Sequence, residues 1–192
     1  MPLLSVDDLL PWTPRRVLVT GTSGAGKTTL STAVAQALGL PRVELDALHH
    51  GPGWVPRVSF AEEVAAFVAQ PRWVTEWQYT DKLGQLLSGR ADTVIWLDHP
   101  RPLVMWQVTR RTLRRRWRRE LLWNGNIEPA LHTLFTDPEH VIRWAWRTHA
   151  KPGRRVAALL EQRGDQVAVV RLRGRAQVGR WLRRLREGCL QG

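Results

Sequence analysis

The segment that most constrains this chain is Gly21-Thr22-Ser23-Gly24-Ala25-Gly26-Lys27-Thr28. Its glycines let the backbone turn tightly, so that successive N–H groups point into one concavity. The apolar run from Arg16 to Thr20 before it is typical of a buried strand, and Lys27 to Leu38 after it places its apolar residues on one helical face. Strand, glycine-rich loop and helix in this order predict a phosphate-binding cradle in an α/β fold.

The same alternation of strand-like and helix-like segments continues along the chain and predicts a parallel sheet with helices on both faces. The expected strands are residues 16–20, 43–46, 71–76, 93–97 and 166–172. The expected helices are residues 27–38, 59–68, 83–87, 102–120, 128–135, 138–162 and 175–187. The predicted architecture is therefore a three-layer fold with a five-stranded parallel sheet.

The cradle is predicted to bind the phosphates of a nucleotide together with Mg²⁺. Lys27 can reach the β- and γ-phosphates as a catalytic cation, and the Thr28 hydroxyl is placed to ligate the metal. No Asn-Lys-x-Asp segment of the kind that reads guanine is present, so ATP is the expected nucleotide. The predicted nucleotide-binding residues of the loop are Gly21, Thr22, Ser23, Gly24, Ala25, Gly26, Lys27, Thr28 and Thr29.

Three acidic residues end predicted strands, where ligands gather in parallel sheets. Asp46 is expected to accept a proton from an acceptor hydroxyl or to hold Mg²⁺ through water, with a helix cap or a hydrogen bond to the loop as the alternative. Glu76 is expected to face the metal through water, with an exposed turn as the alternative. Asp98 is a third candidate that instead caps the following helix.

Histidine and aromatic residues follow the predicted strands and are expected to contact the acceptor. His49 and Trp54 follow Asp46, and Tyr79 follows Glu76; Trp77 is a further ring in the same loop. Adjacent imidazoles at His49 and His50 point in different directions, and no further His or Cys completes a metal-binding spacing, so substrate contact or loop packing is favoured over a metal site.

Seven of the ten residues from 110 to 119 are arginine. On a helix these side chains form two adjacent rows, and such a cationic band is repulsive unless anions meet it. We expect Arg110 and Arg114 to stabilise the transferring phosphoryl group and Arg111 to bind the nucleotide, with a solvated face paired to nearby acids such as Glu120 as the alternative. Closure of this segment would also exclude water.

The composition limits which binding partners and which cellular compartment we expect. The chain has 192 residues, the length of one domain, and 29 basic against 17 acidic residues give a net charge of +12, which favours anionic partners. Nucleic acid is the less favoured of these, since arginine-rich composition also arises from coding bias. Only Cys189 is a cysteine, and no apolar run is long enough for a membrane span. We expect a cytoplasmic protein, and the sequence leaves the oligomeric state open.

The chain resembles the adenylate-kinase-like P-loop kinase family often labelled DNA topology modulation proteins, within the nucleoside monophosphate and shikimate kinase group. The resemblance runs from about Arg16 to Arg173. Its segments are the loop, Glu44-Leu45-Asp46-Ala47-Leu48-His49, Gly51-Pro52-Gly53-Trp54, Trp96-Leu97-Asp98-His99-Pro100, the Arg-rich helix and Leu122-Trp123-Asn124-Gly125-Asn126.

This resemblance implies a P-loop nucleoside-kinase fold over residues 1–192, with residues 102–150 as an Arg-rich helical lid and an adenine-side contact at Arg173 or its neighbours up to Arg175. One departure is Glu76-Trp77-Gln78-Tyr79, where relatives show Asp-Gly-Asn-Tyr; the large ring narrows or alters the expected acceptor pocket. Nothing in these residues resembles a strand-cutting site.

The favoured hypothesis is Mg²⁺-assisted transfer of the ATP γ-phosphoryl group to a small acceptor, which is a nucleotide, a nucleoside or a hydroxylated metabolite. The alternative is a nucleic-acid-binding P-loop ATPase or regulator that uses the charge of +12, and a polynucleotide 5′-kinase lies between the two. The sequence leaves the acceptor's identity open.

Overall fold

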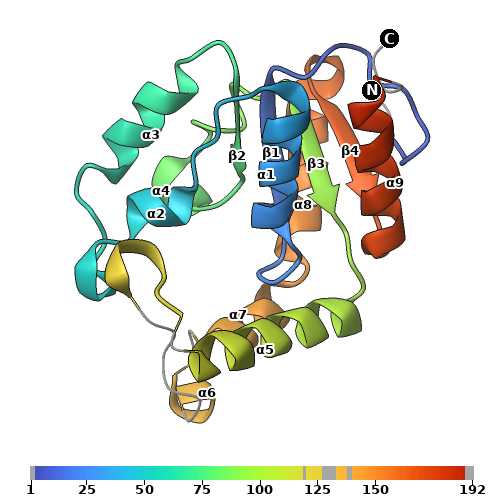
Figure 1. The fold of residues 1–192 in the computed structure, drawn as a ribbon. Coiled ribbons are helices and arrows are strands. Elements are labelled where there is room, and N and C mark those ends of the chain that lie inside the picture. Colours follow the sequence, from blue (N-terminus) through green and yellow to red (C-terminus); the bar gives the residue numbers. More distant parts are fainter. Residues whose placement is uncertain (1–2, 119, 127–132, 138–139, 189–192) are drawn as a thin grey trace.

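A computed structural model describes residues 3–118, 120–126, 133–137 and 140–188. At its centre lies a parallel sheet of four strands in the spatial order β2-β1-β3-β4 (Figure 1). Val17 of β1 is in register with Val74 of β2 on one side and with Thr93 of β3 on the other. The strands are β1 (Arg16–Gly21), β2 (Trp73–Glu76), β3 (Thr93–Leu97) and β4 (Ala168–Leu172).

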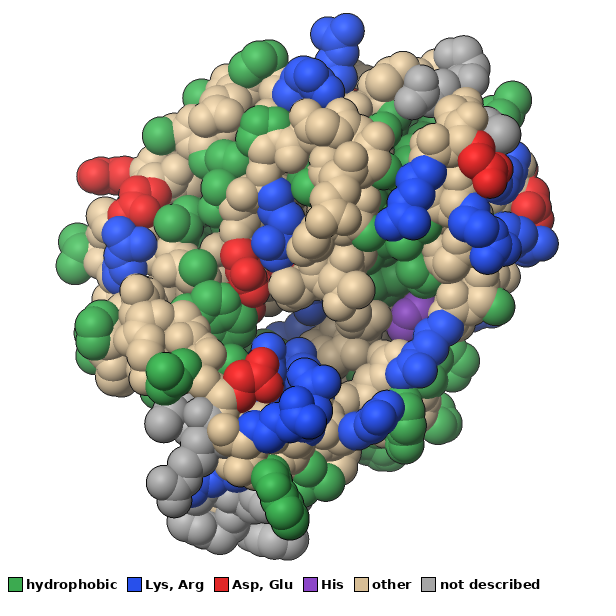
Figure 2. Space-filling view, in the orientation of Figure 1, with side chains coloured by type: hydrophobic (Ala, Val, Ile, Leu, Met, Phe, Trp, Pro, Cys, Tyr) green, Lys and Arg blue, Asp and Glu red, His purple; other side chains and the backbone are tan. Residues whose placement is uncertain are grey.

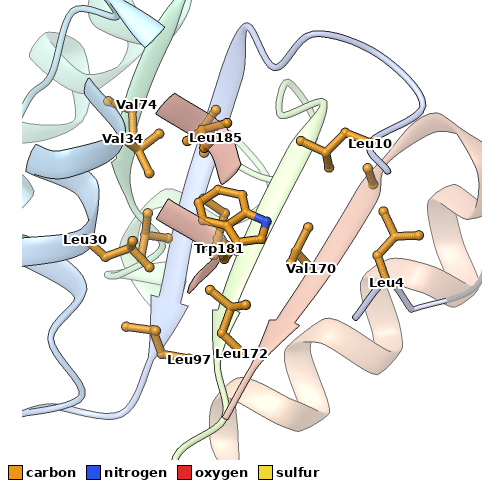
Figure 3. Packing of buried hydrophobic residues seen from close by; sticks show 14 of the residues in the cluster. Leu4, Leu10, Leu30, Val34, Val74, Leu97, Val170, Leu172, Trp181 and Leu185 are labelled. Atoms are coloured by element: carbon orange, nitrogen blue, oxygen red, sulfur yellow. The ribbon is translucent and has the colours of Figure 1, made fainter. Parts of the chain in front are cut away.

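Helices cover both faces of this sheet. Helices α1 (Lys27–Leu38) and α9 (Gly174–Arg186) pack on one face, where Trp181 lies against the sheet (Figure 3). Helices α3 (Phe60–Val68) and α8 (Lys151–Arg163) bury apolar residues in the core of the other face. The core on the α1 and α9 face is the first core, and the core on the α3 and α8 face is the second core. The apolar run of β1 contributes to both, since side chains alternate along a strand: Val17 and Val19 belong to the first core and Leu18 to the second.

The prediction of a fifth strand over residues 43–46 was wrong. The chain beside β2 makes a single parallel bridge, between Arg42 and Val74, and then turns into α2 (Leu45–His49). The carbonyl of Glu44 accepts hydrogen bonds from the N–H groups of Ala47 and Leu48, which starts the helix. Burial of Leu45 in the second core outweighs the weak strand signal of this short run.

The predicted helix over 83–87 was wrong, because α4 (Thr80–Leu83) ends where it was expected to begin and Gly84 follows with a φ of 52°. The other helices match the sequence in position but differ in extent. The predicted helix over 138–162 is divided in two, because His149 and Ala150 separate α7 (Val141–Thr148) from α8 and Pro152 lies in the first turn of α8. Residues 128–132 of the predicted helix over 128–135 and residues 138 and 139 of the predicted helix over 138–162 lie outside the described residues, as do Arg119 and Cys189. The other elements are η1 (Pro52–Trp54), α4 (Thr80–Leu83), α5 (Arg101–Trp117), η2 (Trp123–Gly125), α6 (Thr133–Thr136) and η3 (Gly164–Gln166).

Helix α5 lies apart from the three layers. It packs on α7 and crosses beyond the carboxyl ends of the strands (Figure 1). Figure 2 shows a hollow between this helix and the body of the molecule, with Lys and Arg side chains along its α5 side. This hollow opens at the edge of the sheet where the glycine-rich loop follows β1. Across the described residues, no helix has the length and apolar character that a membrane crossing needs.

Candidate active site

The glycine-rich loop lies directly against α5. Gly24 and Gly26 have φ values of 84° and 94°, in the left-handed region that other residues rarely adopt. A β-carbon at Gly24 would lie 2.7 Å from the β-carbon of Val108 in α5, whereas one at Gly26 would meet nothing within 4 Å. The loop therefore needs glycine at position 24 for two reasons, its backbone conformation and the close approach of α5.

The loop leads into the first turn of α1, as the sequence predicts. The N–H of Ala25 donates to the carbonyl of Thr22 at 3.0 Å, and the Thr22 hydroxyl donates to the carbonyl of His149 at 3.2 Å. Lys27 begins α1 and its Nζ donates to the same Thr22 carbonyl at 3.3 Å. A helix N-terminus adjoining a left-handed glycine loop provides N–H donors suited to phosphate oxygens.

Lys27 is half-buried, and desolvation lowers the pKa of its ammonium group. The carboxylates of Glu76 and Asp46 oppose this effect, while the cations Arg111 and Arg155 add to it. Lys27 thus lies within electrostatic range of the two acids predicted from the sequence and of arginines from α5 and α8. An anion placed among these cations would relieve their repulsion, which is the setting expected of a phosphate site.

A cavity of about 520 Å³ extends from the loop along α5 to α9. Its loop side contains Gly24, Ala25, Gly26 and Thr29 of the predicted set. Its α5 side contains all three arginines predicted to act, together with Trp106 and Gln107. The full lining is Gly24, Ala25, Gly26, Thr29, Leu30, Leu97, His99, Trp106, Gln107, Arg110, Arg111, Arg114, Arg175, Val178 and Leu182.

One wall of this cavity is aromatic and cationic. The guanidinium carbons of Arg110 and Arg175 lie 5.3 Å and 5.1 Å from the Trp106 ring centroid, one from α5 and one from α9. Gln107, with its amide oriented so that both polar atoms have partners, donates to the Gly24 carbonyl at 2.8 Å and accepts from Arg175. This contact joins the loop, α5 and α9 around one cavity.

Arg173 does not line this cavity. Its Nε donates to Asp98 Oδ2 at 2.9 Å, and Arg171 donates to the same oxygen at 2.5 Å. Burial raises the pKa of Asp98, but these two hydrogen bonds and charges outweigh it and lower the pKa below the ordinary value. Asp98 is therefore held by β4 and the residue after it, and it makes no cap on α5. Arg175, which lies within the range expected on the adenine side, lines the cavity.

The arginine rows of α5 divide between the cavity and solvent. Arg110, Arg111 and Arg114 line the cavity. Arg114 and Arg115 also approach Glu120, at 3.9 Å and 4.0 Å, which matches the predicted pairing with that acid. Arg114 lies three and four positions after Arg111 and Arg110, so the helical period places all three next to one another, whereas Arg118 is exposed.

Glu76 ends β2 and is 1% exposed, so the exposed-turn alternative was wrong. Its Oε1 accepts from Arg42 at 3.5 Å and its Oε2 accepts from Gln78 at 2.6 Å. Burial raises the pKa of Glu76, and the nearby Lys27 cation only partly offsets this. The described residues contain no cluster of three or more His, Cys, Asp or Glu side chains that could hold a metal ion. Glu76 and the Thr28 hydroxyl offer the hard oxygens that Mg²⁺ prefers, beside the phosphate loop.

We expect Glu76→Gln to raise the melting temperature at neutral pH. An acid with a folded-state pKa above its ordinary value of 4.5 destabilises the fold progressively as the pH rises above that value, because the native state retains the proton more tightly than the unfolded chain. The variant lacks this decline, and each kcal/mol gained corresponds to about 2–4 °C for a domain of this size. Thermal unfolding from pH 4 to 8 measures it. Glu62→Gln, on the exposed side of α3, is the control, and a wild-type curve parallel to that of Glu76→Gln would contradict the prediction.

Asp46 lies in the first turn of α2, not at a strand end. Its Oδ1 accepts a hydrogen bond from the Tyr79 hydroxyl at 2.6 Å, which links two residues predicted separately. The His49 ring stacks on Tyr79 with centroids 4.2 Å apart and planes 20° apart. Burial raises the pKa of Tyr79, and the Asp46 charge adds to this effect, so the hydroxyl stays protonated as the donor. Asp46, His49 and Tyr79 therefore form one cluster.

Trp54 joins this cluster through the segment after α5. The Trp54 ring lies edge-on to the His50 ring, with centroids 5.0 Å apart. The backbone N–H of Trp54 donates to Asn126 Oδ1 at 3.0 Å. The buried Asn126 amide donates in turn to the carbonyls of Gly51 and Trp123. Trp77, the third aromatic of the predicted loop, is instead buried in the second core. The α2 region is thus tied to η2, on the chain that leaves α5.

Several residues of the site carry no contiguous motif, and sequence reasoning missed them. These are Arg42, Trp106, Gln107, Asn126 and Arg155. Arg42 forms the bridge to β2 and precedes the strand predicted over 43–46, so the rule about carboxyl ends of strands did not point to it. Asn126 lies within the Leu122–Asn126 segment of the resemblance, but only its hydrogen bonds with Trp54 and Gly51 show its structural role.

No protein-family model matches the chain, and the search of curated proteins found no match. Solved structures with a similar fold include a sugar kinase from Janibacter sp. HTCC2649, 20% identical over 93% of each chain with a TM-score of 0.47. They also include a gluconokinase from Sinorhizobium meliloti 1021, 20% identical over 93% of this chain and 97% of that one with a TM-score of 0.46. A shikimate kinase from Acinetobacter baumannii in complex with shikimate is 15% identical over 93% and 94%, with a TM-score of 0.48. Identity at this level does not determine what a chain binds, so the site's own geometry is the basis for its interpretation.

Proposed function

We propose that this protein is a P-loop kinase that transfers the γ-phosphoryl group of ATP to a small acceptor bearing a hydroxyl or phosphate group. The observation that carries the proposal is the arrangement around Lys27. The phosphate loop leads directly into it, three arginines of α5 line the cavity beside that loop, and the Asp46 charge acts on it electrostatically. A site built for hydrolysis alone needs no separate carboxylate and aromatic cluster for a second substrate.

ATP would lie with its phosphates in the Gly21–Thr28 loop and its adenosine part along the 520 Å³ cavity. Trp106, Arg110 and Arg175 offer a flat ring and planar cations on which a base can stack. The apolar side chains of Val178 and Leu182 form the rest of that wall. Lys27, Arg111 and Arg114 would hold the phosphate oxygens, where charge accumulates during transfer.

Asp46 would act as the general base for the acceptor. The acceptor oxygen bonds to the γ-phosphorus, its proton passes to the Asp46 carboxylate, and the bond from the γ-phosphorus to the bridging oxygen breaks to release ADP. His49, Trp54 and Tyr79 would contact the acceptor's body from α2, η1 and the start of α4. The acceptor is thus a small molecule that presents its nucleophilic oxygen towards Lys27 and Asp46.

The residues present fit a magnesium ion. Thr28 would hold it directly and Glu76 through water, and the desolvated carboxylate of Glu76 would gain from a nearby cation. When bound, Mg²⁺ neutralises phosphate charge during transfer.

Residues 102–150 would act as a lid. Val108 packs on Gly24, and Asn124 donates through its side-chain amide to the carbonyls of Ala47 and His50. Two parts of the segment, at positions 108 and 124, therefore contact the nucleotide side and the acceptor side, and closing it would exclude water from both.

An acceptor screen tests the function. Wild-type protein with ATP and Mg²⁺ should form ADP only with the correct member of a panel of nucleoside monophosphates, nucleosides, hydroxylated metabolites and 5′-hydroxyl oligonucleotides. Lys27→Ala should lower kcat/KM by about 10²- to 10³-fold, the cost of losing one preorganised electrostatic contact. Lys151→Ala, at the start of α8 and stacked on Trp144, is the matched control and should retain activity.

No acceptor-dependent ADP across the panel would sink the proposal. The nucleic-acid alternative is the less supported, because Arg110, Arg111 and Arg114 line a cavity beside the glycine-rich loop, where they would meet the phosphates of a nucleotide. Transfer to the oligonucleotides alone would establish the polynucleotide 5′-kinase instead.

A further inference from the structure

Four side chains next to the candidate base form an unbroken row of short polar contacts that ends on it. Lys82 Nζ lies 2.6 Å from His49 Nε2, and His49 Nδ1 lies 3.4 Å from His50 Nδ1. His50 Nε2 lies 3.1 Å from the Tyr79 hydroxyl, which donates to Asp46 Oδ1 at 2.6 Å. The row therefore runs from an exposed lysine through the buried His49 to the carboxylate.

The two ends of this row force one direction on every hydrogen bond in it. A lysine ammonium only donates, so His49 must accept at Nε2 and carry its hydrogen on Nδ1. His50 then accepts at Nδ1 and donates from Nε2 to the Tyr79 oxygen. At the other end an ionised carboxylate only accepts, so the Tyr79 hydrogen points to Asp46. Both ends give the same assignment, with each imidazole neutral and in one defined tautomer.

The surroundings keep both imidazoles neutral. Burial lowers the pKa of His49 to about 4, with His50 and Lys82 adding to the effect and Asp46 and Asp81 opposing it. Burial likewise lowers the pKa of His50; Lys82 adds to this, while Asp46 and the Trp54 backbone oppose it. The aromatic neighbours carry no charge: they are the Phe60 and Tyr79 rings on His49, and the Trp54 and Trp123 rings beside His50.

The row leaves one oxygen of Asp46 for chemistry. Oδ1 is taken by Tyr79, and within the described residues no side chain or backbone group donates to Oδ2. We propose that Lys82, His49, His50 and Tyr79 form a one-way hydrogen-bond chain that positions Asp46, so that Oδ2 receives the proton of the acceptor hydroxyl. This inference rests on the proposed function. Tyr79 and His50 are positioning residues, and Lys82 sets the direction of the chain from the surface.

The hydrogen-bond chain predicts that activity depends on Lys82, although this lysine is exposed at the surface. Protonation of His50 at Nδ1 removes the acceptor that His49 needs and breaks the chain, so activity should be lost as the pH falls through the pKa of His50. The Lys82 cation lowers the pKa of both histidines. Removing that cation raises both pKa values, and the acid limb of the activity profile should move to higher pH.

The first experiment reads the tautomers directly, by long-range proton–nitrogen NMR of the histidine side chains in the full-length protein. We expect His49 protonated on Nδ1 and His50 on Nε2, with both titrating at higher pH in Lys82→Met than in wild type. Lys82→Arg keeps the charge and should keep the wild-type titration, as should the distant Lys151→Met. The opposite tautomer at either histidine, or titrations unmoved in Lys82→Met, would overturn the chain whatever the activity.

The second experiment uses the acceptor found in the screen. Tyr79→Phe keeps the ring stacked on His49 and removes only the hydroxyl, and kcat should fall by about 10- to 100-fold, part of the 10²- to 10⁴-fold that a positioned base contributes. The KM for ATP should stay unchanged, and Lys82→Met should shift the acid limb upward. An unchanged kcat in Tyr79→Phe would overturn the positioning role. If the wild-type protein were inactive towards every acceptor, the proposed function would be refuted. The NMR measurement would still show whether the hydrogen-bond chain exists.

Discussion

Asp46→Asn is expected to lower kcat by about 10²- to 10⁴-fold, the contribution of a positioned general base. Asparagine has nearly the same shape and can still accept from the Tyr79 hydroxyl at Oδ1, so the cluster around α2 is retained. It cannot take a proton from the acceptor at neutral pH. The effect should therefore fall on kcat, while the dissociation constant for Mg²⁺-ATP stays close to wild type, because Asp46 does not line the nucleotide cavity.

The measurements are steady-state kinetics with the acceptor from the screen and tryptophan fluorescence for nucleotide binding. Asp7→Asn is the control for the same chemical change. Asp7 is exposed, pairs with Arg180 and Arg184 of α9, and lies in none of the contacts of the site, so activity should be retained. A kcat for Asp46→Asn within a few-fold of wild type would remove Asp46 as the base.

Gly24→Ala is expected to be the most destabilising of the loop substitutions. Alanine at φ 84° costs about 1–2 kcal/mol in the left-handed region. Its β-carbon would also lie 2.7 Å from Cβ of Val108 and 3.1 Å from Cα of the same residue, so the helix itself must shift. Overpacking of this kind typically adds a cost of about 1–3 kcal/mol.

Gly26→Ala is the matched comparison. Its φ of 94° imposes similar backbone strain, but the new β-carbon meets nothing within 4 Å. The difference in the free energy of unfolding between the two variants therefore isolates the packing of α5 on the loop, and we expect about 1–3 kcal/mol, measured by denaturant unfolding. Equal destabilisation would mean that α5 does not lie against the loop in solution.

The local elements of this fold were largely predictable from the sequence. Strands β1, β2, β3 and β4 are runs of buried, mostly branched residues whose signal lies within a few neighbouring positions, and the four predictions were right to within a few residues. The loop at Gly21 to Thr28 and the long α5 helix were equally clear. Each depends on contiguous residues, so propensity and periodicity suffice.

The segment around Asp46 was not predictable in this way. Residues 43–46 are too short and too mixed to distinguish strand from helix, and burial of Leu45 in the core decided for α2. The error was local, because Asp46 still lies beside the Lys27 region that the strand-end rule indicated.

The loop, its lysine and the arginine-bearing helix were thus determined by the sequence alone, since short-range patterns are sufficient for them. The tertiary structure decided which arginine reaches the cavity, because Asp98 holds Arg173 and leaves Arg175 to line it. It also decided the surroundings of Asp46. Tyr79 is 33 positions away, and only the packing of α2 against the segment after β2 brings its hydroxyl to 2.6 Å from the carboxylate. Contacts between residues so distant in sequence arise from packing of whole elements, which no local pattern encodes.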